Sequence, residues 1–264
     1  MKLLIIGLLS VSVLVVTWRI LSDDPTQGAE TGTPRQPVLV AVDSSGHDND
    51  GVNQGSPAVG LPGRKNTSYS FDREGSWVQV ASKPSLNPGP HDFLFSAWVN
   101  LEATPALGET YDVIRKGLTG TPGGEFKLEV VPEGRLKCSA KAARGRSASI
   151  LGPATDVTDG KWHRIGCART GSSWSAILDG EIVSKTVDLG SISNALPLSI
   201  GSKYGRDDVP RGRVDEVMLF IAHRRPAADF LTLFLPRDRV EQLPQLTPVG
   251  LWHLDEKASR HPRR

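Results

Sequence analysis

Short segments in which large apolar residues alternate with polar or small residues recur along most of this 264-residue chain. The clearest series lies between residues 159 and 221, where Asp-Gly pairs at 159–160 and 179–180 separate apolar stretches. Asp-Gly favours tight β-hairpin turns because both residues tolerate positive φ angles. The pattern therefore predicts consecutive hairpins, closed by two buried strands at 197–201 and 212–220.

Earlier parts of the chain follow the same period of two. The predicted strands before residue 159 are 38–42, 93–101, 111–117 and 125–130, together with a hairpin over 68–80 that turns at Glu74-Gly75. Segment 93–101 is the most apolar, so we place it at the centre of a sheet with Trp98 in the core. Segments 111–117 and 125–130 alternate apolar with polar residues, so each is expected to keep one face in water.

The first 37 residues differ from the rest of the chain. In residues 1–21, one Lys precedes an apolar stretch that fits a secretory signal peptide. No Ala-x-Ala cleavage site follows, so an N-terminal membrane anchor is the alternative, although Arg19 interrupts the apolar stretch. Both interpretations predict an exported domain, which would be secreted, periplasmic or at the cell surface. The polar, Gly- and Pro-containing residues 22–37 predict a flexible linker.

Charge and cysteine content bear on the class of ligand and on whether the domain contains a disulfide. The 31 basic residues are interleaved with 29 acidic ones, and a net charge of +2 argues against a nucleic-acid ligand. The 27 glycines and 19 prolines suit the many turns of one all-β domain. The only two cysteines, Cys138 and Cys167, both fall in predicted strands. An even number of cysteines behind a secretory leader favours a disulfide, and two buried free thiols are the alternative.

A set of motifs carries a family resemblance. In chain order they are Asp43-Ser44-Ser45-Gly46, Ser70-Phe71-Asp72, Trp77-Val78-Gln79-Val80, Phe95-Ser96-Ala97-Trp98-Val99, Asp159-Gly160-Lys161-Trp162-His163, Leu178-Asp179-Gly180, Ile200-Gly201 and Val214-Asp215-Glu216-Val217. Together they resemble the laminin G-like (LamG) domains of the concanavalin A-like lectin/glucanase superfamily. The resemblance implies a two-sheet antiparallel β-sandwich of jelly-roll type. That fold hosts lectins, adhesion modules and hydrolases alike, so it leaves the function open.

We place the sandwich at residues 38–236. One short helix is expected after the last core strand, at 225–234, where Pro226 occupies a first helical position and Pro236 stops the helix. Residues 237–264 then form a C-terminal extension. Within it, segment 249–255 resembles the strand that usually opens a LamG domain. We expect it to pack as an added strand beside the N-terminal one, because the alternative, the stump of a second repeat, would leave Trp252 exposed and a sheet edge unpaired.

The resemblance also suggests a structural calcium ion. Oxygen-bearing side chains crowd the loop 43–51, and Ca²⁺ takes six to eight oxygen ligands. In related domains this loop and an acidic residue on the last strand often hold the ion. The predicted ligands are Asp43, Gly46, Asp48, Asn49 and Asp215. Alternatively, Asp43 and Asp48 cap turns and Asp215 pairs with Arg213.

Catalytic motifs are missing from the sequence. Glucanases of the superfamily carry Glu-x-Asp-x-Glu on one face of a strand, and the chain has no such triplet. Asp215 and Glu216 are adjacent and would point to opposite faces of their strand. His163 is interpreted as a hydrogen-bonded histidine of the sheet, because no Ser or Cys nucleophile shares a motif with it. We therefore predict a protein without enzymatic activity.

The predicted function is recognition of carbohydrate, or of an extracellular or surface protein, through loops at the rim of the sandwich. One basic cluster could receive acidic glycans, namely Lys137, Lys141, Arg144 and Arg146. A solvated charged face is the alternative for this cluster. Two other functions stay open: a glycan hydrolase or lyase with an unfamiliar site, and a purely structural envelope domain.

Overall fold

The computed structural model describes residues 39–72, 75–222 and 247–256, all within the compact unit Val38–Arg264. The predicted leader, the linker and the predicted helix at 225–234 lie outside the described residues. Among the described residues, no helix is long and apolar enough to cross a membrane. The one helical element found there is a single 3-10 turn, η1 (Pro84–Leu86).

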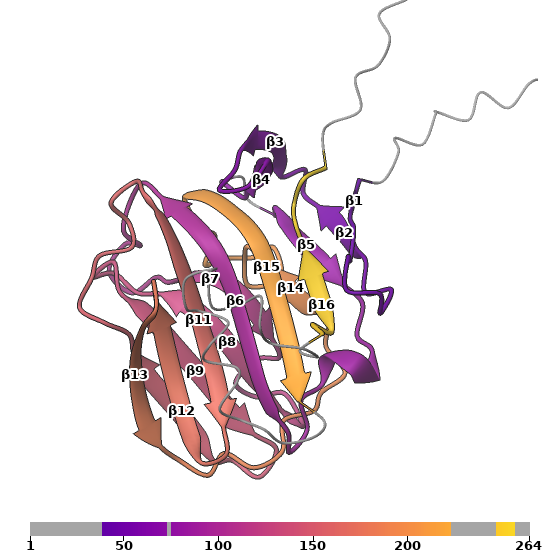
Figure 1. Cartoon of the computed structure of the whole chain (residues 1–264), viewed down its shortest axis with the longest axis vertical. Coiled ribbons are helices and arrows are strands. Elements are labelled where there is room, and N and C mark those ends of the chain that lie inside the picture. The colour runs from indigo at the N-terminus through magenta and orange to yellow at the C-terminus, as the bar shows by residue number, and fades with distance from the viewer. Residues whose placement is uncertain (1–38, 73–74, 223–246, 257–264) are drawn as a thin grey trace, which may run out of the picture. The chain divides into compact units, whose positions relative to one another are not determined.

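Two antiparallel sheets pack face to face (Figure 1). Sheet A has the order β1 (Val40–Ala41), β2 (Gly51–Gln54), β5 (Trp77–Val80), β14 (Leu198–Ile200), β7 (Tyr111–Lys116), β8 (Gly124–Val130), β9 (Leu136–Ala142) and β10 (Ser147–Leu151). Sheet B has the order β13 (Glu181–Thr186), β12 (Ser173–Leu178), β11 (Trp162–Thr170), β6 (Asp92–Leu101), β15 (Gly212–Ala222), β4 (Thr67–Ser70) and β3 (Ala58–Pro62). A further strand, β16 (Gly250–Trp252), also pairs with β15. The predicted all-β jelly-roll sandwich is confirmed.

The core lies between the inner faces of the two sheets. Phe95 on β6 contacts Phe126 on β8 with ring centroids 4.8 Å apart, and Trp174 on β12 completes the aromatic cluster. As predicted, β6 is central in its sheet, between β11 and β15. The prediction for Trp98 is wrong, because the period of two places this residue on the outer face of β6. There the guanidinium of Arg64 lies 4.7 Å from its ring centroid.

Turns are partly as predicted. The pair at 179–180 joins β12 to β13, with φ of 51° at Asp179 and 94° at Gly180, as a tight hairpin requires. The predicted hairpin over 68–80 is wrong, because β4 belongs to sheet B and β5 to sheet A. Alternation along a strand shows which of its residues face the core, but it does not show which of the two sheets the strand belongs to. Strands of both sheets supply apolar side chains to the same interior.

A disulfide joins the two sheets. Cys138 on β9 of sheet A is bonded to Cys167 on β11 of sheet B, with the two Cα atoms 5.6 Å apart. The predicted pairing is confirmed, and the alternative of two free thiols is excluded. A bridge that closes a loop of this size contributes roughly 3 kcal/mol in the chain-entropy description.

The C-terminal strand β16 completes one edge of the interior. It lies alongside β15 in Figure 1, with Trp252 opposite Val217 in the register. The Trp252 side chain is fully buried and its indole N–H donates to the carbonyl of Asn49 at 2.9 Å. Ser44 N–H donates to the carbonyl of Leu251, so the strand also meets the N-terminal loop.

Candidate functional site

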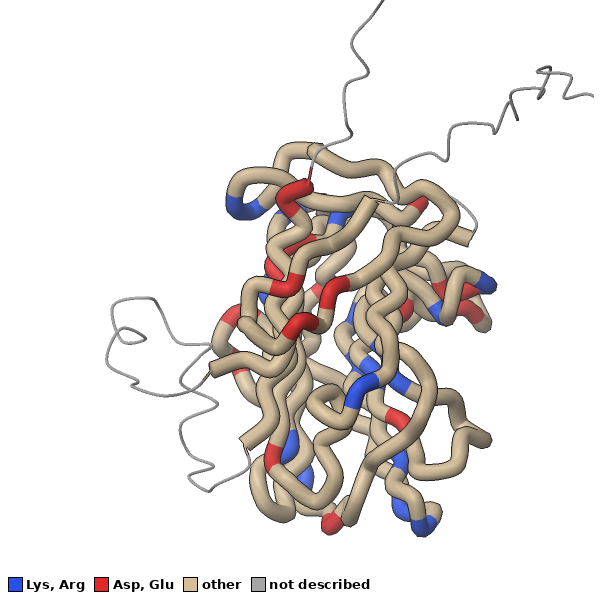
Figure 2. The backbone as a smooth tube through the Cα atoms, turned by 90° about the vertical axis from the view of Figure 1, so that its right-hand side faces the viewer, with Lys and Arg blue, Asp and Glu red and all other residues tan. Residues whose placement is uncertain are grey.

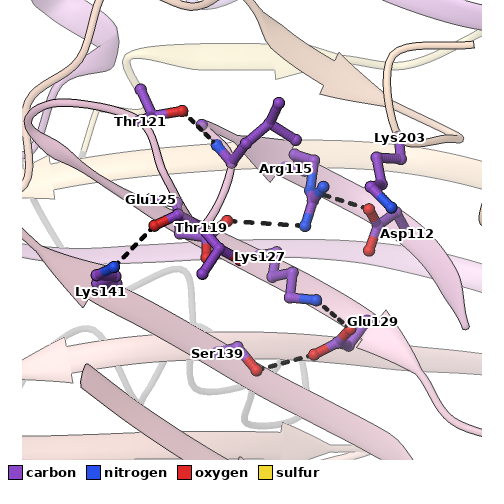
Figure 3. Close-up of polar contacts among 12 residues, drawn as sticks. Asp112, Arg115, Thr119, Thr121, Glu125, Lys127, Glu129, Ser139, Lys141 and Lys203 are labelled. Carbon is purple, nitrogen blue, oxygen red and sulfur yellow. Dashed lines mark hydrogen bonds and ion pairs between the residues drawn. The ribbon is translucent and has the colours of Figure 1, made fainter.

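The outer face of sheet A carries charged residues in register from strand to strand. Asp112 on β7 is opposite Glu129 on β8, which is opposite Lys137 on β9. In the next row, Arg115, Lys127 and Ser139 stand side by side, and a third row pairs Glu125 with Lys141. Antiparallel pairing thus gathers residues from three strands into one charged face, drawn in Figure 3. We call the set Asp112, Arg115, Glu125, Lys127, Glu129, Lys137 and Lys141 the charged face.

Much of the charged face is shielded from water, contrary to the expectation that this side of β7 and β8 stays wet. The side chains of Asp112 and Arg115 are 0% and 3% exposed, and Arg115 Nε lies 2.9 Å from Asp112 Oδ2. The contact is too poorly aligned for a hydrogen bond, and within the described residues neither oxygen of Asp112 accepts one from a side chain. Burial raises the pKa of Asp112 to about 7, although Arg115 and Lys127 favour the charged form.

Glu129, unlike Asp112, is surrounded by hydrogen-bond donors and lysines. Its carboxylate accepts hydrogen bonds from Lys127 Nζ at 2.6 Å and Ser139 Oγ at 2.8 Å, and Lys137 Nζ lies 3.1 Å away. Burial alone would raise the pKa of Glu129, but these neighbours outweigh it and lower the pKa. The carboxylate is therefore held ionised and fully partnered.

Strand β8 carries an arrangement related to the Glu-x-Asp-x-Glu motif of glucanases. Glu125, Lys127 and Glu129 project from the same face of β8, with a lysine where the glucanase motif has an aspartate. The lysine neutralises Glu129, and the Glu129 side chain is inaccessible to water. A glycosidase needs carboxyl groups that reach the substrate. This face is a closed ion-pair network rather than an open cleft.

An open pocket lies at the rim of the sandwich, next to the start of β7. It has a volume of about 600 Å³. We call this cavity the rim pocket. It is lined by Asp72, Gly108, Glu109, Thr110, Tyr111, Lys203, Asp207, Asp208, Val209 and Arg211. They come from the connections before β5, before β7 and between β14 and β15. Binding at rim loops is predicted from the sequence, but none of these residues is, because loops carry no periodic signal.

Asp208 fixes the two main walls of the rim pocket to each other. Its carbonyl accepts a hydrogen bond from Asp112 N–H at 2.8 Å, and its Oδ1 accepts one from Thr110 N–H at 3.3 Å. Its Oδ2 lies 3.4 Å from Lys203 Nζ, which also contacts Asp207. The φ angle of Asp208 is 56°, a conformation that is uncommon outside glycine. The pocket is therefore built from anchored loops, and Asp208 links it to the charged face.

The predicted calcium ligands in the loop 43–51 have other partners. The Asp43 carboxylate accepts hydrogen bonds from the N–H groups of Ser45, Asn49 and Leu251 at 3.0, 2.9 and 2.9 Å, and from Ser45 Oγ at 2.7 Å. Burial raises the pKa of Asp43, but these hydrogen bonds outweigh it and the pKa is lowered. The Asn49 amide donates to the carbonyl of Val249 at 2.6 Å.

The remaining predicted calcium ligands form no metal-binding cluster with Asp43 among the described residues. Asp215 is buried and accepts hydrogen bonds from Lys65 N–H at 3.0 Å and Glu216 N–H at 2.8 Å, and burial raises its pKa to about 6. Gly46 and Asp48 adopt positive φ angles that shape the loop. Nowhere in ranges 39–72, 75–222 and 247–256 do three His, Cys, Asp or Glu residues cluster as metal ligands. The geometry fits hydrogen-bonded turns better than one shared calcium site, and calcium binding stays a prediction.

The four predicted glycan-binding cations are not one free cluster. Lys137 pairs with Glu129, and the Lys141 ammonium donates to the carbonyl of Thr119 at 2.8 Å. Arg146 forms an ion pair with Asp188, while Arg144 is exposed in the turn between β9 and β10. Acidic and basic positions are distributed over both sheets in Figure 2. Two of the four cations, Lys137 and Arg146, are thus already paired with carboxylates.

Solved structures with a similar fold include binding domains of botulinum neurotoxins. The serotype G binding domain is 14% identical, with a TM-score of 0.53, and the match covers 73% of this chain and 47% of that one. A structure of type C, whose cell entry depends on interaction with two ganglioside molecules, is 13% identical with a TM-score of 0.53, covering 76% and 49%. The DC binding domain in complex with rat synaptotagmin II is 14% identical with a TM-score of 0.51, covering 73% and 48%.

The chain spans about half the length of these structures. At such low identity the likeness establishes the fold alone. No curated protein matches the chain by sequence. Residues 72–227, more than half of the chain, match the model of a laminin G family that is described as the concanavalin A-like lectin/glucanases superfamily. With its jelly-roll sandwich and its LamG motifs in place, the chain belongs to the concanavalin A-like lectin/glucanases superfamily.

Proposed function

We propose that this protein is a non-catalytic recognition module that binds carbohydrate in the rim pocket. The observation that carries the proposal is the pocket itself, a cavity of about 600 Å³ at the rim of a lectin-like sandwich. Carboxylates, cations and the Thr110 hydroxyl line it, and such groups donate to and accept from sugar hydroxyls. A cavity of this size falls in the range of small-ligand sites.

Two further observations support binding rather than catalysis. The carboxylates of the charged face are buried in ion pairs, so they are unavailable to a substrate. The fold neighbours named above are binding domains, and one of them interacts with gangliosides. The leader-like residues 1–21 favour export, which is where such a module would meet glycans.

The test is binding of the full-length protein to a glycan array, followed by calorimetry on the best ligands. Glu109→Gln and Arg211→Gln remove charges from the pocket while keeping similar side-chain size, and we expect each to change affinity by about fivefold or more. Glu133→Gln is the matched control, because Glu133 is exposed in the turn between β8 and β9 and does not line the pocket. Glycan binding that ignores both pocket variants would overturn the rim-pocket assignment.

Arg144→Gln separates the two places where a glycan could bind. If this variant loses binding and the pocket variants keep it, the site is the exposed turn after β9 and not the rim pocket. Absence of any glycan ligand, together with specific capture of a surface protein that depends on Glu109 and Arg211, would replace carbohydrate by a protein partner.

A further inference from the structure

The charge of the rim pocket indicates what kind of sugar it takes. Among the residues that the structure describes, four of those lining the pocket are acidic, namely Asp72, Glu109, Asp207 and Asp208, whereas two are basic, namely Lys203 and Arg211. The described part of the lining therefore has an excess of two negative charges. A ligand that enters this cavity leaves bulk water, so the interaction with the lining is screened less than on an open surface.

The cations of the pocket are not equally available to a ligand. Lys203 Nζ lies 3.3 Å from Asp207 Oδ2 and 3.4 Å from Asp208 Oδ2, so two carboxylates already neutralise it. Asp72 and Glu109 form no ion pair within the part of the chain that the structure describes. Among the described residues, the charge left for a ligand thus consists of the carboxylates of Asp72 and Glu109, the guanidinium of Arg211, and the one negative charge that the group of Lys203, Asp207 and Asp208 retains.

A metal ion does not account for these carboxylates. A calcium site would bring at least three such ligands within coordinating distance of one point. The described residues contain no such group, and the acids instead line a cavity large enough for an organic ligand. Carboxylates that line a polar cavity suit a ligand that presents hydroxyl groups together with a cationic group.

We infer that the rim pocket selects a sugar that carries a protonated amine and disfavours sugars that carry carboxylates, such as sialic and uronic acids. This inference rests on the proposed function and specifies its ligand. It differs from what a ganglioside-binding neighbour would suggest, since an acidic sugar would meet an excess of like charge here.

The experiment compares two pairs of ligands whose members differ in charge. A β-1,4-linked glucosamine trimer, its N-acetylated counterpart, lactose and sialyllactose are titrated calorimetrically into the full-length protein. We expect the amine form to bind about tenfold more tightly than the acetylated form, and sialyllactose to bind more weakly than lactose. Raising NaCl to about 0.5 M should reduce the preference for the amine, because screening acts on charge alone.

Two variants that are expected to change the affinity in opposite directions distinguish an effect of charge from an effect of hydrogen bonding. Glu109→Gln removes a negative charge and should weaken binding of the glucosamine trimer about fivefold. Arg211→Gln removes a positive charge and should strengthen binding of the same trimer about fivefold. If the two residues acted only as hydrogen-bonding partners, both substitutions would weaken binding. The control Glu133→Gln should leave the affinity unchanged.

The outcomes separate this inference from the proposed function. Equal binding of the amine and acetylated trimers would overturn the amine preference and leave a carbohydrate-binding pocket standing. Tighter binding of sialyllactose than of lactose would also overturn it. If no sugar binds but an oligolysine peptide does so through Glu109, both the amino-sugar inference and the carbohydrate proposal fail.

Discussion

The imidazole Nδ1 of His163 lies 2.7 Å from Oδ2 of Asp179, the first residue of the tight turn between β12 and β13. The other ring nitrogen, Nε2, lies 3.0 Å from Oδ1 of Asp159. One histidine at the start of β11 thus holds together the two Asp-Gly segments that make the sequence recognisable. Its role as a hydrogen-bonded histidine of the sheet is the one predicted from the sequence.

The two carboxylates make the stability of the fold depend on the protonation of His163. Burial lowers the pKa of His163, but Asp179 and Asp159 outweigh it and the net pKa is raised. Because the pKa is raised, protonated His163 contributes its full stabilisation at pH values below its pKa in the unfolded chain, which is near 6.5. This stabilisation is lost as the pH rises through the pKa of His163 in the folded protein. We expect His163→Gln to lower the melting temperature more at about pH 5.5 than at about pH 8.5. Calorimetry at both pH values checks this, with the exposed His47→Gln as control; equal losses would contradict it.

Asp112 should change the stability in the same direction with pH as His163, but through burial instead of ion pairing. Its pKa is raised to about 7, so between the unfolded value of 3.8 and about 7 the folded protein holds a proton that the unfolded chain has released. Stability due to this residue therefore falls as the pH rises through that window. The neutral Asp112→Asn should gain stability relative to the parent between about pH 5 and pH 8 in urea unfolding. The exposed Asp207→Asn is the control. A relative loss for Asp112→Asn at high pH would show that the Arg115 ion pair dominates over burial.

Strand β16 should be required for a stable domain. Trp252→Ala removes a fully buried indole and a hydrogen bond to Asn49, which we expect to cost roughly 3–5 kcal/mol of unfolding free energy. Trp252→Phe keeps most of the volume and loses the hydrogen bond, so its cost should be clearly smaller. Urea unfolding measures both variants, and an unchanged midpoint for Trp252→Ala would show that β16 does not pack as described.

The role of Asp43 can be separated from calcium binding. Its carboxylate accepts four hydrogen bonds from Ser45, Asn49 and Leu251, so Asp43→Ala leaves donors unpaired and should cost about 1–3 kcal/mol. We expect the same loss in calcium and in chelator, because the geometry assigns these bonds to the protein alone. Melting temperatures in both buffers check this. A loss confined to calcium would instead support the predicted metal site, with Asp48→Ala as the matched comparison in the same loop.

Much of the fold could be predicted from the sequence because its signals are local. Asp179-Gly180 specifies a hairpin through the φ angles of two adjacent residues, and the alternation in segment 93–101 specifies a half-apolar strand. The errors concern information that is not local. Segment 68–80 has strand periodicity on both sides of its turn, yet the period does not say that its halves join different sheets. Trp98 has an apolar neighbourhood in sequence, but its position in the pleat places it on the outer face.

By itself, the sequence determined the family, the all-β class, most strand positions and the presence of exactly two cysteines that could pair. Only the tertiary structure brought Glu109 and Arg211 to one pocket from loops about a hundred residues apart. It also set Asp112 in contact with Arg115 and opposite Glu129 on the outer face of sheet A. Strand formation depends on backbone angles and side-chain alternation, which neighbouring residues encode. A binding site depends on strand register and loop closure, which arise only when distant segments pack.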